Sequence, residues 1–139
     1  MQDSIVKRFG VSMEAKLLRK FDFLVRQQGY ENRSEALRDL VRDALIKQSL
    51  EDSEQMVAGS ILLFYDHHQN QLVKEMSAIQ HRMHELILAT THFHLDYDCC
   101  LELIVVKGKV KDVEYLSQKL TSIKGVEYGK FTVAPVGKM

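Results

Sequence analysis

Apolar and polar side chains alternate along residues 4–12, close to the N-terminus. In an extended chain one side would carry Ile5, Lys7, Phe9 and Val11, and the other side Val6, Arg8, Gly10 and Ser12. A period of two over this length predicts a β-strand.

Apolar residues then recur at the spacing of two helices. The first helix would begin after an N-cap at Ser12 and end at Gly29, and the second would follow the capping-box pattern Asn32-Arg33-Ser34-Glu35. The inward-facing residues would be Leu17, Leu18, Phe21, Leu24 and Val25 in the first helix, and Ala36, Leu37, Leu40, Val41, Ala44 and Leu45 in the second.

One strand and two helices in about fifty residues cannot bury a sufficient core alone. The strand also has no partner within its own segment, so we expect it to pair with the same strand of a second chain. The resulting two-stranded antiparallel ribbon would fit the major groove of DNA, with Arg8, Gly10 and Ser12 toward the bases. The alternative is a dimerisation segment whose strand face contacts only solvent.

The remaining chain alternates strand and helix patterns in the order βαββαβ. The expected strands cover 57–65, 90–95, 100–107 and 125–133, and the expected helices cover 71–89 and 110–123. We therefore predict an α+β protein: a dimeric βαα segment at 1–50, a polar linker at 51–56, and a ferredoxin-like domain at 57–139.

Alternation also predicts which residues share a sheet face. Leu101, Leu103 and Val105 form an apolar set that we assign to the helix-covered face. Cys100, Glu102, Ile104 and Val106 would lie opposite, on the same side as His92 and His94. Because that second face is partly apolar and has no helices of its own, we expect a second copy of the chain to cover it.

Composition excludes several classes of protein. The 139 residues are 45% apolar and 27% charged with zero net charge, unlike collagen-like, disordered or low-complexity chains. No run of about 18 apolar residues and no secretory signal are visible, so we expect no membrane span. The two cysteines are adjacent, which argues against a structural disulfide and favours a reducing, cytoplasmic compartment.

Charge and histidine divide the chain in two. Residues 1–50 carry ten basic and seven acidic side chains, residues 51–139 nine basic and twelve acidic, and all six histidines lie between His67 and His94. We therefore expect two segments of different chemistry.

His92, His94 and Cys100 form a His-x-His-x5-Cys pattern that predicts a metal site. Two imidazoles on one strand face and a thiolate from the next strand can reach one ion, with His81 or His84 as a fourth ligand. This donor set suits Zn(II), Cu(II) or Ni(II). Surface histidines and a core cysteine are the simpler interpretation, and they remain preferred for His67, His68 and Cys99.

The first fifty residues resemble the ribbon-helix-helix family of bacterial repressors. The resemblance rests on the strand, the first helix, Gly-Tyr, and then Asn-Arg-Ser-Glu-Ala-Leu-Arg-Asp-Leu-Val-Arg. It implies that Asn32, Arg33 and Ser34, at the N-terminus of the second helix, lie near a DNA phosphate. Arg33 would assist there or pack locally.

Almost the whole chain resembles the nickel-responsive regulator (NikR) family, which has an ACT-type metal-binding domain. The matching motifs are Arg-Phe-Gly-Val-Ser, Gly-Tyr-Glu-Asn-Arg-Ser-Glu-Ala, Tyr-Asp-His-His, Ile-Gln-His and Thr-His-Phe-His-Leu-Asp-Tyr-Asp-Cys-Cys-Leu-Glu. The resemblance implies one square-planar Ni(II) per chain, bound by His92, His94 and Cys100 with His81 of a facing subunit, in a homotetramer built as a dimer of dimers.

The same resemblance implies further roles. Glu102 would orient a nickel ligand, and Glu35 and Asp39 match an acidic pair that holds potassium between the domains when DNA is bound. Arg8, Gly10 and Ser12 match the base-facing positions, although Gly10 replaces the usual hydroxyl residue. Gln69 and Asn70 stand where relatives carry basic residues, which implies weaker nonspecific affinity for DNA.

We therefore expect a cytoplasmic, nickel-dependent transcriptional repressor that binds double-stranded operator DNA and is not an enzyme. A small metallohydrolase would need an open coordination position and a general base. A zinc or copper storage protein or chaperone would leave the strand–helix–helix segment unexplained. A metallohydrolase predicts turnover by the metal-loaded protein, and a storage protein or chaperone predicts the absence of specific DNA binding.

Overall fold

The structure, a computed structural model, describes residues 5–137 and divides into two compact units between Asp43 and Ala44. The division falls inside α2 (Arg33–Ser49), earlier than the predicted linker at 51–56. The helix runs on without a break because its sequence contains no glycine or proline. Leu50, which follows the helix, packs against the core of the second unit.

The first unit contains α1 (Ala15–Gln27) and most of α2. The predicted N-cap at Ser12 is wrong: Glu14 precedes the helix, and its carbonyl accepts the first helical hydrogen bond from Leu18. Capping residues mark the neighbourhood of a helix start more reliably than its exact position. The predicted end is confirmed, because Gly29 has a φ of 75° and the Tyr30 N–H donates to the Val25 carbonyl, as in a Schellman motif.

The start of α2 agrees with the predicted cap. The Asn32 Oδ1 atom accepts a hydrogen bond of 2.9 Å from the Glu35 backbone N–H. This bond satisfies one of the free N–H groups at the helix N-terminus, so asparagine at this position favours a helix that begins at Arg33.

Residues 5–14 form no strand in the single chain. Ser4, where the predicted strand begins, lies outside the described residues. A strand needs a hydrogen-bonding partner, and the described residues of one chain supply none here. The apolar side chains are therefore exposed, with Val6 82% and Phe9 76% accessible. Pairing of this segment with a second chain stays a prediction.

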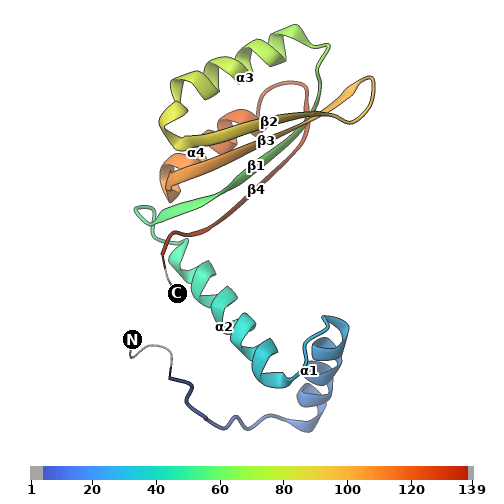
Figure 1. Ribbon diagram of the computed structural model, residues 1–139, viewed down its shortest axis with the longest axis vertical. Helices are drawn as coiled ribbons and strands as arrows, with labels where there is room; N and C mark the ends of the chain where they lie inside the picture. The colour runs from blue at the N-terminus through green and yellow to red at the C-terminus, as the bar shows by residue number, and fades with distance from the viewer. Residues whose placement is uncertain (1–4, 138–139) are drawn as a thin grey trace. The chain divides into compact units, whose positions relative to one another are not determined.

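The second unit confirms the predicted βαββαβ order (Figure 1). Its elements are β1 (Met56–Asp66), α3 (Asn70–Arg82), β2 (Ile87–His94), β3 (Cys99–Lys109), α4 (Val110–Thr121) and β4 (Val126–Pro135). The four strands form one antiparallel sheet in the order β2-β3-β1-β4. The helix predicted at 71–89 ends at Arg82. The prediction extended too far because apolar residues continue from the helix into β2, and no glycine or proline between them marks the end of the helix.

One face of the sheet is covered by α3 and α4. The core combines Leu72, Met76 and Ile79 of α3 with Val113, Leu116 and Leu120 of α4, and with Ile61 and Leu63 of β1. Burying this apolar surface is the main stabilising contribution to the unit. Ion pairs connect the loop before β1 to the start of α4: the Glu54 carboxylate pairs with Lys109 and Lys111.

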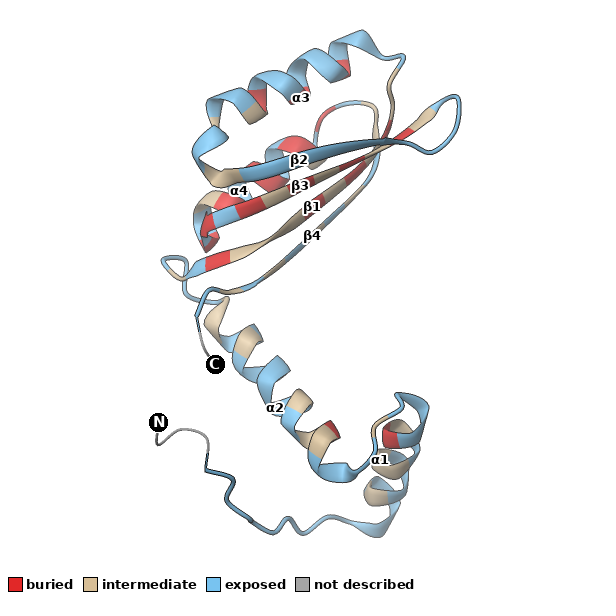
Figure 2. Cartoon of the chain, viewed as in Figure 1, coloured by how far each residue is buried: buried red, intermediate tan, exposed pale blue. Residues whose placement is uncertain are grey.

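The prediction of which sheet face the helices cover is wrong. Cys100, Glu102, Ile104 and Val106 are buried under the helices, whereas Leu101, Leu103 and Val105 are half-buried on the open face, as is Cys99 (Figure 2). The central strands are apolar on both faces, so alternation shows which residues share a face but not which face the helices cover.

The open face is apolar and is not covered by the described residues of the chain. Leu103 of β3 pairs with Leu62 of β1, and the Phe64 ring meets the Tyr128 ring edge-on, with 5.8 Å between centroids. This face, rather than the histidine-bearing one, is the surface that needs a cover. None of the described helices is long and apolar enough to cross a membrane.

Candidate metal centre

The register of β2 against β3 places the three predicted strand ligands on one face of the sheet. His92 stands opposite Glu102 and His94 opposite Cys100, so all four side chains share one face. The His94 Nδ1 atom lies 3.3 Å from the Cys100 sulfur, and the rings of His92 and His94 are 5.0 Å apart between centroids. The prediction that Cys100, and not Cys99, lies on the histidine side is confirmed.

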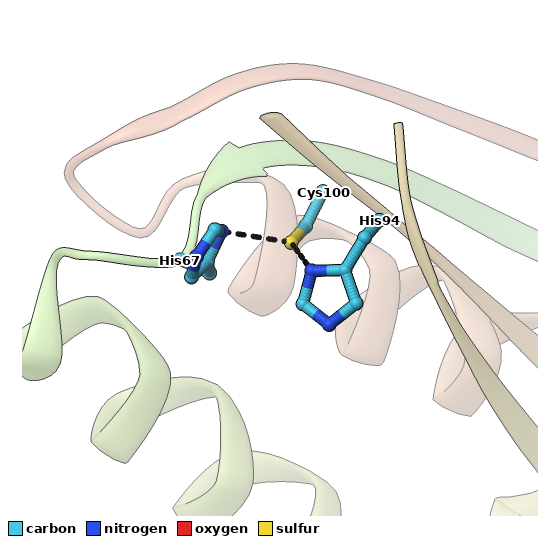
Figure 3. A group of neighbouring side chains, drawn as sticks. All are labelled: His67, His94 and Cys100. Atoms are coloured by element: carbon cyan, nitrogen blue, oxygen red, sulfur yellow. Dashed lines mark hydrogen bonds between the residues drawn. The ribbon is translucent and has the colours of Figure 1, made fainter. Parts of the chain in front are cut away.

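His67, for which the sequence favours a surface role, also belongs to this cluster. Its Nδ1 atom lies 3.1 Å from the Cys100 sulfur (Figure 3), and its ring is 5.2 Å from the His94 ring between centroids. The ligand atoms of His67, His94 and Cys100 all lie within 4.8 Å of one another. The signal was available in the topology: β1 and β3 are antiparallel neighbours, so the residue after β1 meets the start of β3.

The donor set fits a borderline-soft transition metal. A thiol and two imidazoles whose ligand atoms lie within 4.8 Å of one another are ligands that nickel, copper and zinc accept. Burial raises the pKa of the Cys100 thiol above its usual value, with a smaller contribution from the neighbouring Cys99. A metal must therefore displace a proton from this sulfur when it binds.

A buried hydrogen-bond network supports His92. Glu102, which is 7% exposed, accepts a bond of 3.1 Å from the Tyr65 hydroxyl and another of 3.1 Å from the Gln80 amide. The Tyr65 oxygen lies 3.1 Å from His92 Nδ1. Burial and the adjacent Glu102 raise the pKa of Tyr65 well above its usual value, so the hydroxyl stays protonated.

The other histidines lie outside the cluster that one chain forms. His81 is exposed in the last turn of α3, and the His84 ring, 6.3 Å from the His81 ring between centroids, lies next to the His81 carbonyl. His68 contacts the Tyr97 carbonyl through Nε2 at 3.1 Å. Within the described part of one chain, His81 is therefore not brought to Cys100, and its predicted role depends on a second chain.

The predicted DNA-contacting residues lie in the first unit. Arg8, Gly10 and Ser12 are all exposed, and nothing lies within 4 Å of where a Cβ atom on Gly10 would stand. Asn32 and Ser34 flank the start of α2, where free N–H groups favour an anion.

Arg33 is engaged within the first unit. Its guanidinium donates two hydrogen bonds, of 2.8 and 2.9 Å, to the Asp22 carboxylate of α1. This pairing holds the pKa of Asp22 below its usual value. Of the two roles considered for Arg33, local packing is the one that this geometry favours.

In the acidic pair of α2, Glu35 and Asp39, the carboxylate of Asp39 already accepts hydrogen bonds from other side chains. Asp39 accepts a hydrogen bond of 2.7 Å from the Tyr30 hydroxyl and one of 3.0 Å from Arg42. These bonds, that from Tyr30 foremost, lower the pKa of Asp39. Glu35 is half-buried beside it, in a hollow that is also lined by Arg38. A cation bound here would meet an ionised carboxylate but also compete with two arginines.

Comparison with known proteins accounts for both units. The profile of the NikR C-terminal nickel-binding domain matches residues 58–134, and that of ribbon-helix-helix proteins of the copG family matches residues 7–48. Relatives from Solidesulfovibrio magneticus, Solibacter usitatus and Pyrococcus abyssi carry "nickel-responsive regulator" in their names. They are 47%, 46% and 45% identical to this chain, and each match covers 94–95% of both chains.

These matches extend over nearly the whole chain and agree with the observed element order. A ribbon-helix-helix segment accounts for the two helices of the first unit, and a nickel-binding domain accounts for the histidine- and cysteine-bearing sheet. The chain therefore belongs to the nickel-responsive regulators, a non-enzymatic family that joins a ribbon-helix-helix DNA-binding domain to a C-terminal nickel-binding domain.

Proposed function

We propose that this protein is a nickel-dependent transcriptional repressor. Ni(II), one ion per chain, would be bound by His92, His94 and Cys100 of one chain and by His81 of a second. The observation that carries the proposal is the pairing of His94 with Cys100, which presents an imidazole nitrogen and a sulfur 3.3 Å apart. Strands hold such a pair more rigidly than loops would, so part of the site is preorganised.

A second chain is required for two reasons in this proposal. His81 lies at the exposed end of α3, which suits a ligand donated to a neighbouring copy. The open apolar face around Leu103 and Phe64 needs a cover that a second copy can supply. Two different contacts per chain would generate the homotetramer, a dimer of dimers.

The DNA-binding part would form by pairing the segment around Arg8 with its copy. Pairing would satisfy the backbone groups of residues 5–14 and would bury the exposed Phe9 and Val11. Arg8, Gly10 and Ser12 would then face the major groove of an operator, and Asn32 and Ser34 would meet phosphate. Potassium between Glu35 and Asp39 belongs to the same proposal.

Nickel would act by changing the relative stability of two arrangements. A ligand shifts an equilibrium only as far as its affinities for the two states differ. Four ligands drawn from two chains favour the arrangement in which both chains are correctly placed. Nickel supply would thus control the spacing of the DNA-binding dimers. The protein would act in the cytoplasm, on genes for nickel uptake or for nickel enzymes.

The decisive experiment is a selection of DNA fragments by the full-length protein with and without Ni(II). We expect a palindromic operator to be enriched only with nickel, and its binding to weaken steeply with salt. No nickel dependence at any sequence would refute the proposal. Tight nickel binding without DNA selection would favour a storage or chaperone role, and turnover by the metal-loaded protein would favour a hydrolase.

A further inference from the structure

A chain of hydrogen bonds runs from His92 on the edge strand to helix α3. The His92 Nδ1 atom lies 3.1 Å from the Tyr65 oxygen, and the Tyr65 hydroxyl donates to Glu102 Oε2 at 3.1 Å. The other Glu102 oxygen accepts from the Gln80 amide at 3.1 Å. Thr90 donates in turn to the Gln80 carbonyl oxygen at 3.2 Å.

The direction of each bond in this chain follows from the chemistry of its members. A carboxylate only accepts hydrogen bonds, so the single proton of the Tyr65 hydroxyl goes to Glu102. Toward His92 the Tyr65 oxygen is then left with a lone pair and can only accept. The proton between them must therefore belong to His92, on Nδ1.

We propose that Tyr65 is a positioning residue that keeps His92 in its Nδ1–H form and thereby selects His92 Nε2 as the metal-binding nitrogen. A neutral imidazole carries one proton, so a proton held on Nδ1 leaves a free lone pair on Nε2. His94 and His67 differ, because each directs Nδ1 toward the Cys100 sulfur. This inference rests on the proposed nickel site and adds to it the nitrogen through which one ligand binds.

The role extends beyond filling space in the core. Without the hydroxyl, His92 is free to carry its proton on Nε2, and the ion would meet an N–H group instead of a lone pair. Groups that orient metal ligands in this way typically contribute about 10- to 100-fold in metal affinity.

The test reads the His92 tautomer directly in the metal-free, full-length protein. Long-range proton–nitrogen NMR distinguishes protonated from unprotonated ring nitrogens, and the spectrum of a His92→Gln variant identifies the His92 signals. We expect the Nδ1–H form in the wild type. We expect a shift toward the Nε2–H form in Tyr65→Phe and no change in Tyr115→Phe, which removes a half-exposed hydroxyl from α4.

A second variant keeps Tyr65 and reverses the direction of its hydrogen bonds. In Glu102→Gln the new amide can donate to the Tyr65 oxygen, and the Tyr65 proton then turns toward His92 Nδ1. We expect the Nε2–H form here as well, with a loss of nickel affinity of about 10- to 100-fold in both Tyr65→Phe and Glu102→Gln.

The outcomes separate this inference from the proposed function. An Nε2–H tautomer in the wild type, or an unchanged tautomer in both variants, would overturn the role of Tyr65 even if nickel binds. Failure of the wild type to bind nickel would refute the proposed function while leaving the tautomer result standing. If Tyr65→Phe fails to fold, the wild-type spectrum and Glu102→Gln still decide.

Discussion

The sulfur of Cys100 and the Nδ1 atom of His67 lie 3.1 Å apart, although 33 residues separate them in the chain. The contact arises because His67 follows β1 directly and Cys100 lies near the start of the antiparallel β3. Two ligand sets therefore share His94 and Cys100: one adds His92 and a second chain's His81, and the other adds His67 of the same chain.

The two sets make opposite predictions for single substitutions. We expect His81→Ala to abolish tight nickel binding and His67→Ala to preserve one ion per chain, measured by equilibrium dialysis against Ni(II). His84→Ala, one turn beyond His81, is the matched control and should behave like the wild type. Loss of nickel in His67→Ala with retention in His81→Ala would make His67 the fourth ligand.

The two adjacent cysteines should differ sharply in their response to substitution. We expect a sulfur-to-nickel charge-transfer band in the near-ultraviolet spectrum. Cys100→Ser should abolish both the band and nickel-dependent DNA binding, because a hydroxyl is a poor ligand beside imidazoles. Cys99→Ser should keep both, since Cys99 points to the open sheet face. The reverse pattern would mean that nickel binds on that open face.

Arg8 should contribute to sequence recognition rather than to general DNA affinity. Arg8→Ala is expected to lose about 1–3 kcal/mol of operator binding, with a much smaller loss on random DNA, if the guanidinium contacts guanine. Lys7→Ala, on the opposite side of the paired strand, should not reduce the preference for the operator. Equal losses on both DNAs in a titration of Arg8→Ala would restrict Arg8 to phosphate contact.

The acidic pair Glu35 and Asp39 should make DNA binding depend on potassium. Replacing them with Gln and Asn should weaken operator binding and remove its dependence on potassium, while nickel stoichiometry is unchanged, because hard cations prefer carboxylate oxygens. Tyr30→Phe removes the hydrogen bond to Asp39 but keeps the charge, and should retain the potassium dependence. Operator affinity that is constant across potassium concentrations in the wild type would contradict the site.

Glu54 should contribute a small, pH-dependent stabilisation. Lys109 and Lys111 lower its pKa from 4.5 to about 2 in the folded protein. A lowered pKa stabilises the fold above the unfolded value, and this contribution disappears as pH falls through about 2. Glu54→Gln should therefore lower the melting temperature slightly above about pH 4.5 but not near pH 2. A calorimetric difference that is constant with pH would contradict this assignment, and Glu51→Gln serves as the control.

The sequence alone determined most local features, because they depend on residues near one another in the chain. Asn32 and Gly29 supply a side-chain acceptor and a positive φ wherever the helices pack, so the start of α2 and the end of α1 were predictable. The same is true of His94 and Cys100, which share a face once two adjacent strands form a hairpin.

The covered face of the sheet was decided only by tertiary structure. Both faces of β3 are apolar, so Leu103 and Ile104 were equally good candidates for the core, and helix packing selected Ile104. His67 and Tyr65 reached the site for a related reason. Their neighbours Cys100, His92 and Glu102 lie on strands 27 to 37 residues away, and such pairings depend on the strand order of the sheet rather than on any local pattern.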